Sequence, residues 1–204
     1  NPSVFKAHLD ATVKPLMIGQ DPLQIERHWE RLSLGVGAAT VRHPSQVVGI
    51  IDICLWDILG KVAGLPVYTL MGGATRKSIQ LYWSQGSGWE KQPEDMRRDV
   101  ETGLDMGFTA FKIRMDWKDY RQDSNPTKDF AIFKLCREFL PDELPLGFDA
   151  NNGYSVSTAI MQGVKMQELG LAHFEEPLPQ YDLPGLKQVV DALDVPISTG
   201  EQET

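Results

Sequence analysis

Three acidic residues, Asp149, Glu175 and Glu201, recur at equal intervals of 26 residues, each after a short apolar run typical of a β-strand. One strand–helix unit has about this length, so each acid holds the same place in its unit. In a parallel barrel such places meet at the carboxyl ends of the strands. Three carboxylates gathered there would repel one another and resist ionisation. A hard divalent cation such as Mg²⁺, which prefers oxygen ligands, removes that conflict. The alternative is that each acid caps the helix that follows it.

Two cations, Lys112 and Arg114, lie at the end of an earlier apolar run, residues 110–115. In a strand, alternate side chains point to opposite faces. Lys112 and Arg114 would then share one face, while Phe111, Ile113 and Met115 would face surrounding helices. We expect the two cations to point into the mouth of a barrel. A solvated pair of charges at a strand end is the simpler alternative.

The elements that must position these groups alternate along the chain after residue 76. Apolar runs predict strands at 79–83, 110–115, 146–148, 173–174 and 196–198, and helical patterns lie between them at 94–106, 128–139, 156–169 and 183–193. This order predicts a parallel sheet, either an open doubly wound sheet or a barrel. No Gly-x-Gly-x-x-Gly follows any strand, which argues against a dinucleotide site.

The first part of the chain, residues 1–45, is expected to be helical and then loop-like. Asp21 and Pro22 predict a helix start, with the Asp as N-cap. Residues 35–39 are expected to form a flexible connection. A long helix should begin at 44–45 and end before Gly64. It is apolar almost all round, so we expect it to be buried.

Composition narrows the class of partner. The net charge of −8 argues against a nucleic acid, which would call for a basic patch. No window reaches the roughly 18 uninterrupted apolar residues of a membrane span. Cys54 and Cys136, both in apolar helix-like runs, are interpreted as reduced core residues of a cytoplasmic protein.

Taken together, the motifs resemble the mandelate racemase and muconate lactonizing enzyme branch of the enolase superfamily. In order, they are Lys112-Ile113-Arg114, Asp149-Ala150-Asn151, Glu175-Glu176-Pro177 and Gly200-Glu201. Residues 52–61 and 64–73 are also similar to the family's passage from one domain into the next. The two intervals of 26 residues match the family as well.

The resemblance implies an α/β fold with an α+β capping domain and a partial (β/α)₇β TIM-type barrel. Residues 1–75 would be the helical part of the capping domain, and residues 76–204 the first half of the barrel, strands 1–5. A full barrel needs about 250 residues. We therefore expect the capping sheet before residue 1 and the later strands beyond residue 204.

The resemblance also implies a chemistry, the Mg²⁺-dependent removal of the proton α to a carboxylate. Asp149, Glu175 and Glu201 would be the ligands of one Mg²⁺ ion. Asn151 and Glu176 would either lie behind these ligands or face a small-molecule carboxylate substrate. The residue types at the end of the first strand, Tyr82, Trp83, Ser84 and Gln85, would themselves suit a hydroxylated substrate. A homo-oligomer is expected from the family.

Arg114 departs from the second lysine that many relatives carry as base. Arginine stays protonated, so Arg114 would bind a carboxylate or a developing negative charge. Lys112 would serve as base if its pKa were lowered; otherwise the base is a histidine beyond residue 204. His173 is interpreted as a packed strand residue.

A single base favours dehydration over two-base racemisation. The leading hypothesis is a carbon–oxygen lyase that dehydrates an aldonate or aldarate to a 2-keto-3-deoxy acid. The alternatives are a racemase, epimerase or cycloisomerase, a non-catalytic metal-binding relative with a regulatory role, and an unrelated barrel.

Overall fold

The computed structural model describes residues 2–34, 43–115 and 122–202. The chain divides into two compact units, residues 1–79 and residues 80–203, and each is described by itself. Within the described residues, no helix is both long enough and apolar enough to cross a membrane.

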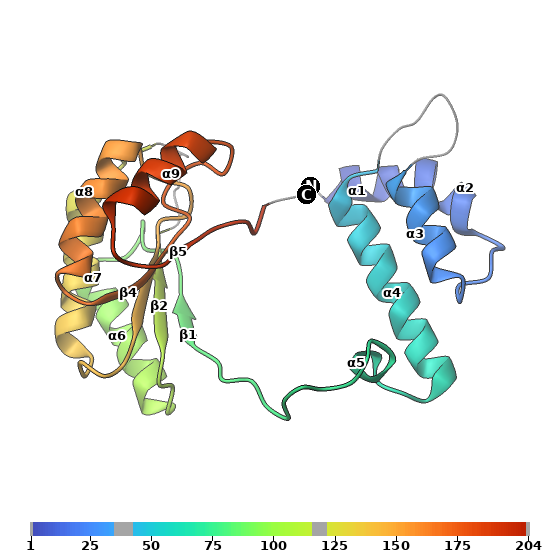
Figure 1. The fold of residues 1–204 in the computed structure, drawn as a ribbon, viewed down its shortest axis with the longest axis horizontal. Coiled ribbons are helices and arrows are strands. Elements are labelled where there is room, and N and C mark those ends of the chain that lie inside the picture. Colours follow the sequence, from blue (N-terminus) through green and yellow to red (C-terminus); the bar gives the residue numbers. More distant parts are fainter. Residues whose placement is uncertain (1, 35–42, 116–121, 203–204) are drawn as a thin grey trace. The chain divides into compact units, whose positions relative to one another are not determined.

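The first unit is helical. Its elements are α1 (Pro2–His8), the π-helical turn η1 (Leu9–Val13), α2 (Lys14–Met17), α3 (Ile25–Ser33), α4 (Ser45–Ala63) and α5 (Val67–Leu70). Helices α3 and α4 run side by side (Figure 1). A small core forms where the first elements meet α3 and α4, from Val13, Leu32, Val47 and Val48. Gly64 ends α4 in the left-handed conformation, as the sequence predicts.

Three expectations for this unit are wrong. Helix α3 begins at Ile25, because the Asp21 carboxylate accepts a hydrogen bond from the Leu23 backbone N–H (2.9 Å) in a turn that precedes the helix. Helix α4 is not buried all round: Ile53 is 69% exposed within this structure. Cys54 is also exposed, so only Cys136 is a core cysteine, and both are free thiols.

The second unit contains a sheet of five parallel strands in the order β1-β2-β3-β4-β5. The strands are β1 (Trp83–Gln85), β2 (Phe111–Arg114), β3 (Leu146–Asp149), β4 (Leu171–Glu175) and β5 (Ile197–Ser198). Each strand pairs with the next along the chain, whereas in a doubly wound sheet the spatial order of the strands reverses at one point. The order is that of a partial barrel, which confirms the predicted fold class.

Four helices connect these strands: α6 (Pro93–Asp105), α7 (Pro126–Phe139), α8 (Val156–Gln167) and α9 (Leu183–Ala192). Successive helices contact one another. Figure 1 shows α6, α7 and α8 along the same side of the sheet. All four have proline at the first or second helical position or a side-chain N-cap, such as Ser155 before α8.

The strands separate two kinds of side chain. Phe111, Phe148 and Phe174 are fully or almost fully buried in the core between the sheet and its helices. Their neighbours Lys112, Gly147 and Glu175 alternate with them and therefore belong to the opposite face. This alternation places the predicted chemical groups on the face away from the helix layer.

The first strand begins later than its apolar pattern predicts. Residues 79–83 are the predicted strand, but Ile79 and Leu81 are exposed. Pairing with β2 begins at Trp83, whose backbone N–H donates to the Ala110 carbonyl (2.8 Å). Backbone partners, not apolar content, determine where this strand starts.

A buried polar pair joins α7 to the loop after β3. The hydroxyl of Tyr154, which is fully buried, donates to Asp129 Oδ2 (2.9 Å). Burial disfavours the charged carboxylate and raises the pKa of Asp129 to about 6, although the bond from Tyr154 opposes the shift.

This pair predicts a pH-dependent stability. The pKa of Asp129 in the folded state lies above its ordinary value of 3.8. Its stabilising contribution is therefore complete below about pH 4 and is lost as the pH rises through about 6, an effect on the order of 3 kcal/mol. We expect the free energy of unfolding to fall less between pH 4 and pH 7 for Asp129→Asn than for the unaltered protein, because the asparagine does not ionise.

Urea unfolding at the two pH values measures this difference. Asp191→Asn, at an exposed position of α9, is the matched control and should keep the original pH dependence. Equal pH dependence in the Asp129 variant and the unaltered protein would contradict the assignment.

Candidate metal centre

The sheet register brings three predicted site residues to one edge. Arg114 at the end of β2 pairs with Asp149 at the end of β3, and Asp149 pairs with Glu175 at the end of β4. Neighbouring strands lie about 4.8 Å apart. The end of each strand thus carries a charged group next to that of its neighbour.

Lys112 occupies the space between two of these carboxylates. Its ammonium Nζ donates to Asp149 Oδ2 (3.0 Å) and to Glu175 Oε2 (2.9 Å). Lys112 is 7% exposed and Asp149 is 4% exposed, while Glu175 is partly buried. One ammonium therefore bridges carboxylates from two neighbouring strands and offsets part of their negative charge in a largely buried position.

The electrostatics follow from burial and charge together. Burial disfavours the charged form of Lys112, but the bond to Glu175 and the charge of Asp149 outweigh it and raise its pKa. Burial raises the pKa of Asp149, and the nearby ammonium only partly offsets this. The lowered pKa that Lys112 would need as a base is therefore absent from this arrangement.

The turns after β3 and β4 have unusual backbone geometry. Asn151, Asn152 and Glu176 have positive φ angles of 49°, 63° and 40°. Asparagine tolerates this region better than most residues. The Asn151 backbone N–H donates to Asp149 Oδ1 (2.9 Å), so the turn holds the second oxygen of that carboxylate. This gives the Asp-x-Asn pattern a local physical reason.

Glu176 is held within the site, directly after Glu175. It is 2% exposed, and its Oε2 accepts a hydrogen bond from Asn152 Nδ2 (2.7 Å). Its Oε1 is buried without a hydrogen-bond partner among the described residues. Burial raises the pKa of Glu176, and the charges of Glu201 and Asp149 add to this.

Glu201 is the third predicted ligand. Glu201 is exposed in the turn after β5, and its charge contributes to the raised pKa of Glu176. Within the described ranges, no group of three or more His, Cys, Asp or Glu side chains is arranged to hold a metal ion. Asp149 and Glu175 do fit a cation, because a cationic group already lies between their oxygens.

Trp83 faces the helix layer. Its indole N–H donates to the Asp99 carbonyl of α6 (2.9 Å), and a Cβ on Gly103 would overlap its ring. It pairs in register with Phe111. The expectation that Trp83 contacts substrate does not fit this orientation. Strand β1 would have to shift by one residue against β2 to bring the Trp83 side chain to the site face. Ser84, the register partner of Lys112, lies on the site face instead.

His173 belongs to the site face as well, which its apolar surroundings in the sequence did not indicate. Its Nε2 lies 3.7 Å from Glu175 Oε2. Burial lowers the pKa of His173, and the charge of Glu175 partly offsets this. The ring lies over Gly147 of β3, where a Cβ would overlap it. The period of two in β4 could have placed His173 beside Glu175.

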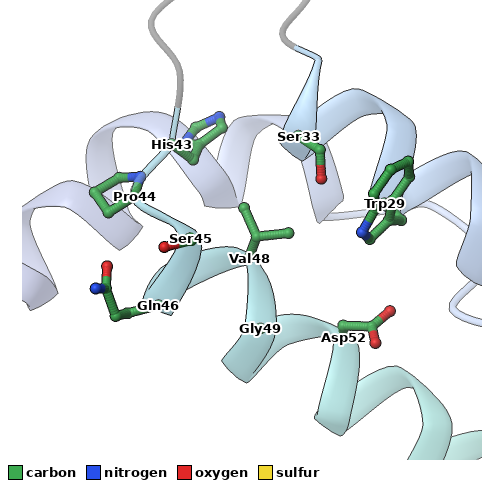
Figure 2. A pocket seen from close by; sticks show the side chains of 9 residues that line it. All are labelled: Trp29, Ser33, His43, Pro44, Ser45, Gln46, Val48, Gly49 and Asp52. Carbon is green, nitrogen blue, oxygen red and sulfur yellow. The ribbon is translucent and has the colours of Figure 1, made fainter. Parts of the chain in front are cut away.

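A separate hollow of about 710 Å³ lies in the first unit. Figure 2 shows Trp29 and Ser33 of α3 opposite Val48 and Asp52 of α4. None of the predicted site residues lines it.

Comparison with known proteins identifies the family. The family model "Enolase C-terminal domain-like" matches residues 95–204, and the model "Mandelate racemase / muconate lactonizing enzyme, N-terminal domain" matches residues 2–72. The chain belongs to the mandelate racemase/muconate lactonizing enzyme family. The resemblance based on the four motifs is thereby confirmed.

Two relatives in this family are named as sugar-acid dehydratases. The chain is 36% identical to L-talarate/galactarate dehydratase from Salmonella typhimurium over 92% of its own length and 46% of that enzyme. It is 31% identical to arabinonate dehydratase from Saccharolobus solfataricus, over 93% of the chain and 50% of that enzyme. The chain spans about half the length of these relatives.

A solved structure of the mandelate racemase/muconate lactonizing enzyme family has the same fold. A protein from Paracoccus denitrificans PD1222, complexed with magnesium, superimposes with a TM-score of 0.85 at 34% identity. The match covers 98% of this chain and 54% of that one.

The close approach of the His173 ring to Gly147 predicts that substitutions at these two positions have coupled effects on stability. Gly147→Ala would force the His173 ring to move, and overpacking of this kind costs about 1–3 kcal/mol. His173→Ala in the same chain should recover part of that loss, because it removes the ring. Urea unfolding of the two single variants and the double variant measures the coupling. Additive losses would show that the two residues do not meet.

Proposed function

We propose that the complete protein is a Mg²⁺-dependent sugar-acid dehydratase, a carbon–oxygen lyase. The observation that carries the proposal is the pair Asp149 and Glu175, whose oxygens share one cationic group at neighbouring strand ends. Membership of the family and the two named dehydratases support the class of reaction. We also propose that residues 1–75 form the helical part of a capping domain and residues 76–204 the first half of the barrel.

In this proposal Asp149, Glu175 and Glu201 hold the metal. All three present carboxylate oxygens, which are the ligands that Mg²⁺ prefers. When bound, the metal supplies positive charge for the substrate carboxylate and for the negative charge that develops next to it. The turn at Asn151 orients Asp149 through its backbone N–H, and Glu176 lies beside Glu175 at the substrate side.

We assign Arg114 to substrate binding. Lys112 is assigned to the catalytic groups, on the same face of β2. A guanidinium stays protonated and forms paired hydrogen bonds to carboxylates, so Arg114 suits a second acidic group of the substrate or its developing charge. Lys112 alternates onto the same face of β2 and contacts both proposed ligands. Ser84 on β1 adds a hydroxyl to that face.

The proposed reaction removes one molecule of water. The C–H bond α to the carboxylate breaks and a base on the protein takes the proton. The pair of electrons forms a carbon–carbon double bond while the β C–O bond breaks, and the departing hydroxyl gains a proton to leave as water. The resulting enol becomes a 2-keto-3-deoxy acid by tautomerisation.

The test is release of keto acid by the complete protein from a set of aldonates and aldarates with Mg²⁺. We expect turnover with at least one acid, its loss on chelation of the metal, and a fall of at least about 100-fold for Glu175→Gln, since a missing ligand weakens metal binding and removes transition-state stabilisation. Glu138→Gln, an exposed change on α7, is the control and should retain activity.

Racemisation or epimerisation of a carboxylate, without keto-acid release from any sugar acid, would overturn the dehydratase proposal and favour the isomerase alternative. Mg²⁺ binding with neither reaction would favour the regulatory alternative.

A further inference from the structure

Lys112 is placed as a cation would be in the proposed metal centre. Its Nζ lies 3.0 Å from Asp149 Oδ2 and 2.9 Å from Glu175 Oε2. Both the ammonium and Asp149 are almost entirely buried. The same two oxygens cannot serve a lysine ammonium and a metal ion at full strength, because two cations at such short range repel each other strongly in a site of low dielectric.

The two carboxylates also depend on this ammonium. Asp149 and Glu175 are register partners on adjacent strands, so without a cation their like charges would face each other. Lys112 therefore stabilises the arrangement while no metal is bound. Removing one charge from a buried group of this kind leaves the others uncompensated.

A second position is available to the Lys112 ammonium near an aromatic ring. A lysine has a flexible stem of four carbons, and its ammonium is a compact point charge. The ring of Tyr82 lies nearby, with its centroid 5.8 Å from Nζ, at the range where a cation is attracted to an aromatic face. Tyr82 is about half exposed. An ammonium that moves from the carboxylates toward this ring would therefore interact with the aromatic face and with water.

We propose that the Lys112 ammonium is an internal counter-ion that holds Asp149 and Glu175 ready and is displaced from them when Mg²⁺ binds. This inference rests on the proposed function, because it takes these two residues as metal ligands. It makes Lys112 a competitor of the metal, so loss of its charge strengthens metal binding. A lysine that only supported the fold would weaken metal binding when removed.

Calorimetric titration of the complete protein with Mg²⁺ tests the competition. We expect Lys112→Met to lower the dissociation constant for Mg²⁺ by about tenfold or more, because a charge that opposes the metal is gone. Lys112→Arg keeps the charge and should stay much closer to the unaltered protein. Lys134→Met, which removes an exposed charge from α7, is the control for net charge and should leave the dissociation constant unchanged.

Thermal unfolding of the same proteins provides a second measurement. In the presence of a chelator, Lys112→Met should unfold at a lower temperature than the unaltered protein, and Mg²⁺ should raise its unfolding temperature by the larger amount. Equal or weaker Mg²⁺ binding by a folded Lys112→Met protein would overturn the inference and leave the proposed function intact. Absence of Mg²⁺ binding in the unaltered protein would overturn both.

If Lys112→Met does not fold, the unaltered protein decides the question through the chemical reactivity of its lysines. Mass spectrometry after brief amine labelling should find Lys112 more heavily modified with Mg²⁺ than with a chelator, and Lys134 equally modified in both. Unchanged labelling of Lys112 would overturn the inference.

Discussion

The ion pairs of Lys112 with Asp149 and Glu175 depend on one constraint, the register of three neighbouring parallel strands. Strand alternation places these groups on the face away from the helices. The register sets Asp149 level with Glu175, while Lys112 pairs with Gly147, two residues before Asp149. A slip of one residue in any of the strands would exchange charged groups for buried phenylalanines. The apolar core and the charged centre therefore specify the same register from opposite faces.

A group of aromatic side chains lies directly behind the proposed ligands, on the helix side of the sheet. Phe148 packs against Phe174 with a ring separation of 5.9 Å, and each of these residues directly precedes a proposed ligand along its strand. Tyr154 extends this aromatic group, and its hydroxyl connects it to α7 through Asp129. Changes in this layer can thus alter the position of Asp149 and Glu175 from the far side of the sheet.

Much of the second unit could be predicted from sequence, because its strands and helices repeat at a regular interval and the three acids follow that interval. Alternation in residues 110–115 also placed Lys112 on the face opposite Phe111 and Ile113, which lie in the core. The first unit was harder. Asp21 has the features of an N-cap but closes a turn, and the apolar pattern of α4 does not indicate which of its sides is covered in this structure.

Side-chain arrangements within the centre could not be predicted from residue types. Spacing indicated three gathered carboxylates, whereas in the structure Lys112 joins two of them and Glu201 is exposed in a later turn. The position of Trp83 depended on where β1 starts, because one residue decides which face a side chain occupies. Local pattern specifies the element more strongly than its first residue.

The contact between Gly147 and His173 has a consequence for how this protein can evolve. A side chain gained at position 147 forces the imidazole above it to move, so the energetic effects of the two positions are coupled. A lineage that reduced residue 173 first could afterwards accept alanine at 147, whereas the reverse order would pass through an overcrowded intermediate. Substitutions at these two positions should therefore occur together, and the change to a smaller residue at 173 should precede the change to a larger residue at 147.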